Sequence, residues 1–161
     1  MGGLVSGNYG MRLDKKAVVE DFLSIDVRRW HREGALRPGQ VFTWVWQRDG
    51  RDVASIGVRV RREAVELSYT VGPDGEDVRC SIALERRRCH FGGSRPWFVC
   101  PGVVNGVACG RRVAILYGPP GRYFLCRHCY GLSYRSRQES KDFQVTAGNS
   151  IVSISWVRRA L

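Results

Sequence analysis

The chain has 161 residues, 43% hydrophobic and 25% charged, which suits a globular protein of one domain or of two small ones. No apolar run approaches the roughly 18 to 20 residues of a membrane span. The first residues also lack the apolar stretch of a secretory signal, so we expect a cytoplasmic protein.

The net charge of +11 is unevenly spread. Residues 1–39 carry +2 and residues 40–88 carry +1, whereas residues 89–161 hold 10 basic and 2 acidic side chains, a net +8. This half therefore favours an anionic partner. Of the 26 basic residues 23 are arginine, the better phosphate ligand, although a compositional bias without any binding role would produce the same count.

The N-terminal part predicts a loose leader over residues 1–13 and then two short helices. Asp14 can cap a helix over 15–23, and a second helix over 26–33 can end at Gly34. A helix-turn-helix is the alternative, but the spacing is tight for it. We therefore expect a helical pair that packs on a sheet.

The next part predicts a four-stranded antiparallel meander, since apolar and polar residues alternate along each run. Asp49-Gly50 is a hairpin signal between the first two strands. Phe42, Trp44 and Trp46 share one face, where they suit a core or an interface better than a base-stacking platform. The expected strands are residues 41–47, 52–60, 65–71 and 78–85.

After the sheet, "RRRCHFGGSRP" (residues 86–96) has the basic, glycine and proline content of a bend between two domains. The fold class predicted is α+β, with short N-terminal helices, the meander and a C-terminal cysteine-rich unit. The domains expected are a leader with a helical pair (1–39), the sheet (40–90), the cysteine-rich unit (91–140) and a mostly uncharged, strand-like tail (141–161).

Four of the six cysteines, Cys100, Cys109, Cys126 and Cys129, follow the pattern C-x8-C, sixteen residues, C-x2-C. The sixteen residues read as two strands around "GPPG", and such a hairpin would bring both cysteine pairs together. Four thiolates around one tetrahedral ion is the zinc arrangement. Two disulfides, unexpected without a secretory signal, and an iron–sulfur cluster are the alternatives.

The other two cysteines, Cys80 and Cys89, do not follow a metal-binding pattern. Cys80 is in phase with Ile82 and reads as a small buried side chain. A second metal site could combine Cys80, Cys89, His90 and His31, but their irregular spacing argues against it. His128, between two ligands, is expected to point outward.

The two cysteine pairs and their hairpin, residues 97–134, resemble the zinc-ribbon group. The resemblance implies that the C-terminal cysteine-rich unit (91–140) is a zinc ribbon. The chain departs from that group at C-x8-C, so "PGVVNGVA" is expected to bulge out as a loop. More widely, "FGGSRPWFVCP", "CGRRVAILY" and "FLCRHCYGLSYRSRQES" resemble uncharacterised small proteins of bacterial prophages and other mobile elements. That resemblance implies no activity.

Nucleic-acid binding is the function we expect, because basic and aromatic residues interleave around the cysteines. A solvated basic face, with tyrosines packed in the ribbon core, is the alternative. The residues expected to contact nucleic acid are Arg111, Arg112, Arg122, Tyr123, Arg127, Arg135 and Arg137.

A protein-binding role is the other function weighed, as an inhibitor of a host complex such as a nucleic-acid-guided defence system. Exposed Trp30, Trp97 or Trp156 would then be anchors. Catalysis is not expected, because a zinc ion with four thiolates has no open position for water. Carboxylates are also scarce after Glu85.

Overall fold

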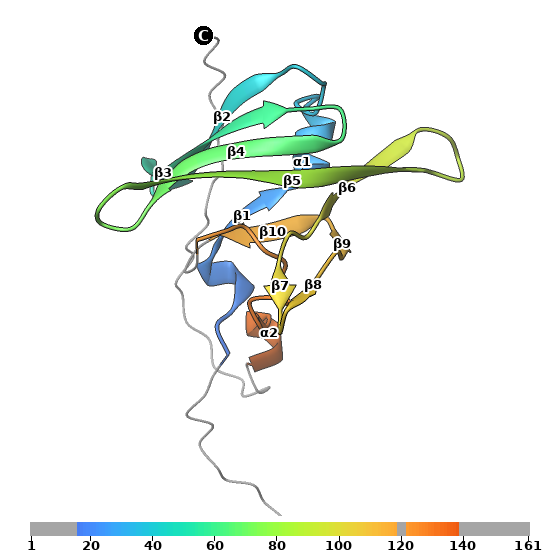
Figure 1. Ribbon diagram of the computed structural model, residues 1–161. Coiled ribbons are helices and arrows are strands. Elements are labelled where there is room, and N and C mark those ends of the chain that lie inside the picture. The colour runs from blue at the N-terminus through green and yellow to red at the C-terminus, as the bar shows by residue number, and fades with distance from the viewer. Residues whose placement is uncertain (1–15, 119–121, 139–161) are drawn as a thin grey trace, which may run out of the picture.

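The computed structural model describes residues 16–118 and 122–138. Its main feature is a curled, antiparallel sheet of six strands (Figure 1). The four predicted strands of the meander are confirmed, and two further strands extend the sheet. In spatial order the strands are β2 (Val41–Arg48), β3 (Arg51–Val60), β4 (Ala64–Val71), β5 (Glu76–Arg88), β6 (Ser94–Val99) and β9 (Arg112–Val113).

One face of the sheet is buried against helix α1 (Val27–Arg32). The Trp30 ring of this helix meets Phe42, Trp44 and Phe98 edge to face, at centroid distances of 5.4, 5.7 and 5.7 Å. Such pairs add stability beyond the apolar area that they bury. The core role expected of the β2 aromatics is therefore confirmed. The prediction that Trp30 is an exposed anchor is wrong, because its side chain is fully buried.

The helix predicted over residues 15–23 is wrong. The described part of this segment, residues 16–23, holds the 3-10 turn η1 (Val19–Asp21) and the first residue of the strand β1 (Leu23–Asp26). The helical pattern is overridden because β1 pairs with β10 (Ile115–Gly118), in register from Leu23 opposite Gly118 to Asp26 opposite Ile115. A pairing across so many residues leaves no local signal in the sequence.

The second predicted helix is present as α1. Asp26 is its N-cap, and its carboxylate accepts a hydrogen bond from the Arg28 amide at 2.8 Å. The same carboxylate binds the Arg28 guanidinium, with a shortest N–O distance of 2.7 Å. A cap of this kind satisfies an amide that the first turn leaves without a partner.

The bend predicted over residues 86–96 is a β-hairpin. β5 runs on to Arg88, a turn follows, and β6 begins at Ser94 and pairs back along β5. The sheet thus continues across residue 90, where the sequence placed a domain boundary. The predicted α+β class fits broadly, although strands dominate. The predicted leader (1–13) and tail (141–161) lie outside the described residues.

Among the described residues, no helix combines the length and apolar character that crossing a membrane would require.

Candidate metal centre

The first cysteine pair flanks a short hairpin of its own. Cys100 follows β6 directly, and β7 (Val103–Val104) pairs with β8 (Val107–Ala108) before Cys109. Asn105 and Gly106 form the turn with positive φ angles of 52° and 76°, as the tightest hairpin turns require. The Cys109 amide closes the loop by donating to the Gly102 carbonyl at 2.7 Å. The loop predicted to bulge out between the two cysteines is thus a short β-hairpin, which the Asn-Gly pair indicates.

The second pair follows a return of the chain that the sequence predicted. Tyr117 and Leu125 exchange both backbone hydrogen bonds, at 2.8 and 3.0 Å, which confirms an antiparallel contact around "GPPG". Cys126 then begins a tight turn, in which the Leu132 amide donates to the Arg127 carbonyl at 2.8 Å. Gly131 takes a φ of 63° at the end of this turn, a conformation that suits glycine.

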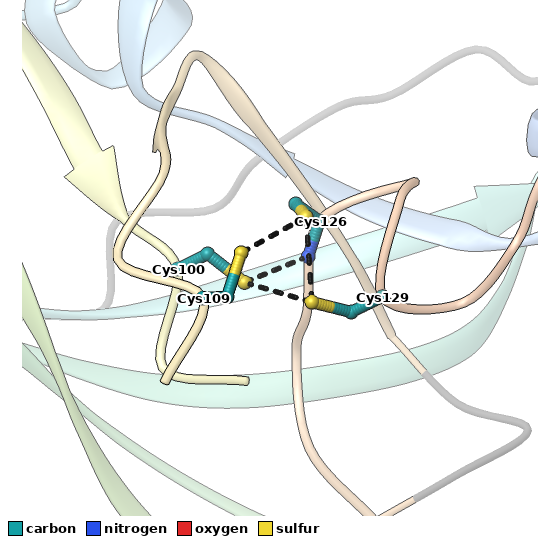
Figure 2. A group of neighbouring side chains, drawn as sticks. All are labelled: Cys100, Cys109, Cys126 and Cys129. Carbon is teal, nitrogen blue, oxygen red and sulfur yellow. Dashed lines mark hydrogen bonds between the residues drawn. The ribbon is translucent and has the colours of Figure 1, made fainter. Parts of the chain in front are cut away.

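The four sulfurs converge from these two turns (Figure 2). The Sγ–Sγ distances are 3.7 Å for Cys100 and Cys129, 3.8 Å for Cys109 and Cys126, and 3.6 Å for Cys126 and Cys129. All four atoms lie within 4.8 Å of one another. Four sulfurs bound at about 2.3 Å to one tetrahedral ion would lie about 3.8 Å apart. The cluster therefore has the dimensions of a metal site.

Disulfides do not account for this geometry. The Sγ–Sγ distance of 3.6 Å between Cys126 and Cys129 is far longer than the roughly 2.0 Å of a disulfide bond, and all four cysteines are free thiols. The fit to a metal follows from the donor set and from the spacing of its sulfurs. The four residues could hold a metal ion, as the sequence predicted.

The protein surroundings hold the sulfurs in place. Cys100 and Cys126 are buried, and the Cys126 amide donates to the Cys100 sulfur at 3.2 Å. Burial raises the pKa of Cys100 to about 11, although the Cys126 and Gly102 amides act against that rise. The pKa of Cys109 is lowered, chiefly by the Arg111 amide. Amides directed at sulfur stabilise the thiolates that a metal requires.

Gly102 is needed for the close approach of the two turns. A Cβ atom at this position would lie 2.7 Å from the Cys129 sulfur and 3.4 Å from the Cys100 sulfur. Its backbone φ is not in the left-handed region, so space is the only reason for glycine here. No pattern in the sequence singles out Gly102, which lies two residues after Cys100.

The four residues considered for a second metal site do not form a cluster. Within residues 16–118 and 122–138, the four-cysteine cluster is the only group of three or more potential ligands found close together. Cys80 is half-buried, 3.9 Å from the Tyr69 hydroxyl, so its predicted full burial is only partly met. Cys89, His90 and His31 are exposed, as is His128, which was expected to point outward.

Three of the arginines predicted to bind nucleic acid pair with carboxylates. Arg112 pairs with Glu85 on the sheet at 3.2 Å, and Arg122 pairs with Glu76. Arg135 pairs with Asp21 at 3.0 Å. The carboxylates thus come from three separate places along the chain, and they partly neutralise these arginines.

Two of the arginines lie beside the cysteine cluster. Arg111 is exposed, and within the described part of the chain neither it nor Arg127 has an ion pair. The Arg127 guanidinium lies 5.2 Å from the centroid of the Tyr134 ring. Desolvation and then the positive charges of Arg127 and Arg111 lower the pKa of His128, so both arginines lie near this side chain.

The tyrosines of this region have mixed roles. Tyr123 and Tyr134 are exposed, whereas the Tyr130 hydroxyl donates to the Tyr123 carbonyl and helps to hold the hairpin. The Arg122 carbonyl accepts a hydrogen bond from the Tyr69 hydroxyl at 2.8 Å, which attaches the hairpin to the sheet. The Arg137 side chain lies outside the described residues.

A scan against protein-family models gives no match for this chain. Searches of the curated proteins and of the solved structures give no match either. The resemblance to zinc-ribbon proteins of prophages therefore stays a prediction, and any function must be argued from the site itself.

Proposed function

We propose that the four-cysteine cluster binds one structural Zn²⁺ ion. Four thiolates in a tetrahedral set, two of them buried, suit zinc and leave no position for a reacting water. Iron in the same ligand set is the competing assignment. Metal analysis of protein purified without chelator should give about one equivalent of zinc. Iron instead of zinc, or less than half an equivalent of any metal, would reject the assignment.

We further propose that the protein binds nucleic acid and catalyses no reaction. The observation that carries this proposal is the position of Arg111 and Arg127. Each lies within two residues of a metal ligand, both lie near His128, and neither has an ion pair in the described chain. A cation fixed in this way loses little conformational entropy when it meets a phosphate.

Binding to a labelled 30-mer, measured by fluorescence anisotropy over a salt series, tests this function. The affinity should fall linearly on a log–log plot against salt concentration. A double variant, Arg111→Gln with Arg127→Gln, should reduce the slope by about 2. Arg51→Gln, a change to an exposed arginine on the β2–β3 hairpin, is the matched control. Lack of binding at low salt would reject the proposal.

One feature favours the protein-binding alternative. Val103, Val104 and Val107 on the β7–β8 hairpin are 66%, 47% and 70% exposed. Apolar side chains gathered on one projecting hairpin suit a protein partner better than they suit phosphates. A pull-down from bacterial lysate separates the two functions. A partner that is retained after nuclease treatment, and lost with Val103→Ser and Val107→Ser, would favour protein binding.

A further inference from the structure

The β5–β6 hairpin continues beyond the sheet as a two-stranded arm (residues 85–97). β4 pairs with β5 only as far as Ala83, and β9 pairs with β6 only at Phe98 and Val99. Between these limits the two strands of the arm pair with each other alone. Figure 1 shows the arm, in yellow-green, extending past the other strands.

The arm is strongly basic. It carries four arginines, Arg86, Arg87, Arg88 and Arg95, against the single carboxylate of Glu85. Arg87 and Arg95 lie directly opposite each other, an arrangement that destabilises a strand pair unless another charge compensates. Glu85 binds Arg87 at 2.9 Å, but it also binds Arg112 at 3.2 Å, so the arm keeps a positive excess.

The arginines of the arm differ in their contacts. Arg86 donates to the Arg62 and Leu36 carbonyls, at 2.7 and 3.1 Å, and so fixes the base of the arm. The Arg88 guanidinium makes no hydrogen bond or ion pair with the described chain, and Arg95 lies 4.5 Å from the centroid of the Trp97 ring. Because Arg88 and Arg95 are on opposite faces of the ribbon, the arm presents cations on both sides.

An aromatic side chain occupies the tip. The Gly92 amide donates to the Cys89 carbonyl at 3.1 Å, so His90 and Phe91 are the two corner residues of the turn. Gly92 and Gly93 follow with φ angles of 91° and 76°. Phe91 is 99% exposed, and its only ring contact in the described structure is with His90, at 5.2 Å. Arginines alone could protect the free edges of a ribbon from other strands, but edge protection does not require a phenylalanine at the tip.

We propose that this arm enters a groove of double-stranded DNA, with Phe91 wedged between base pairs and Arg88 and Arg95 on the two flanking phosphate strands. A narrow ribbon with cations on both faces and an apolar tip has the features of such a wedge, which acts from the minor groove and kinks the duplex. The proposal deepens the proposed nucleic-acid function, on which it rests, and it assigns contact to residues outside the cysteine region.

The test uses the full-length, zinc-loaded protein and a 30-base-pair DNA duplex labelled at both ends. Energy transfer between the labels should rise on binding, because the duplex bends. Phe91→Ala should abolish the rise and weaken binding about tenfold, with an unchanged salt slope. Arg88→Gln with Arg95→Gln should instead lower the salt slope by about 2. Val53→Ala, a change to an exposed apolar residue on β3, should alter neither quantity.

The outcomes separate this proposal from the general one. If the wild-type protein binds DNA in a salt-dependent manner but Phe91→Ala still bends it, the arm proposal fails and the nucleic-acid function stands. Tighter binding to duplex RNA or to a single strand would also overturn the arm proposal. If the wild-type protein binds no nucleic acid, both proposals fail. Unchanged zinc content and an unchanged melting temperature will show that each variant is folded.

Discussion

Substitution of Gly102 by alanine should weaken metal binding without any change to a ligand. The added Cβ would lie 2.7 Å from the Cys129 sulfur and 3.3 Å from the Cys129 Cβ. Ordinary contact lies near 3.5 to 4.0 Å, so the two turns must separate by about 1 Å. Metal–ligand distances deviate by only about 0.2 Å from their usual values in a functional site. We therefore expect zinc affinity to fall by at least the 10- to 100-fold that is typical of lost support around a ligand.

Competition with a chromophoric chelator measures this loss directly. Gly106→Ala is the matched control, because it makes the same change in the same loop, and nothing lies within 4 Å of the added Cβ. That variant carries backbone strain at a φ of 76°, so its stability should fall while its zinc affinity remains near that of the wild type. If Gly102→Ala holds zinc as tightly as the wild type, the two turns do not approach as described.

Three further results are expected. Cys126→Ser should remove the metal and unfold the cysteine region, as measured by metal analysis and circular dichroism, whereas Cys89→Ser, at an exposed thiol, should change neither. Phe124→Ala should destabilise the protein by about 3 to 5 kcal/mol in urea unfolding, because this buried ring stacks on Trp46 and meets Tyr69 edge to face. Burial alone would raise the pKa of Asp26, but its bonds to Arg28 outweigh burial and lower it. The stability that Asp26 contributes is therefore present at neutral pH and lost as the pH falls through that lowered pKa, and Asp26→Asn should flatten the acid limb of the unfolding profile.

The sequence predicted the features that depend on local patterns. Alternation along β2 to β5 located the meander, and the return of the chain around "GPPG" brought Cys109 and Cys126 to within 3.8 Å of each other. The helix over residues 15–23 failed, since the partner of β1 is β10, far along the chain. No local sequence pattern indicates a pairing between strands that lie so far apart in the chain.

The proposed nucleic-acid surface was harder to predict for the same reason. Arg122 and Arg135 lie close in sequence to the second cysteine pair, but their charges are partly neutralised by Glu76 and Asp21, which only the fold brings near. Conversely, Arg88 and Arg95 lie in a segment that reads as a bend. Only the pairing of β5 and β6 places them on the two faces of one arm. A count of charges near a motif cannot distinguish these two cases.

The four-cysteine cluster and the sheet share one core. Cys100 and Cys126 are packed in the same buried group as Trp30, Trp46 and Phe124. The turn after Cys129 also bonds to the start of the described chain, where the Ser133 amide donates to the Ala17 carbonyl at 3.0 Å. Loss of the ion should therefore loosen β1 and the sheet as well as the cysteine region. Calorimetry of the zinc-loaded protein should show one transition, and two separate transitions would mean that the cluster and the sheet fold independently.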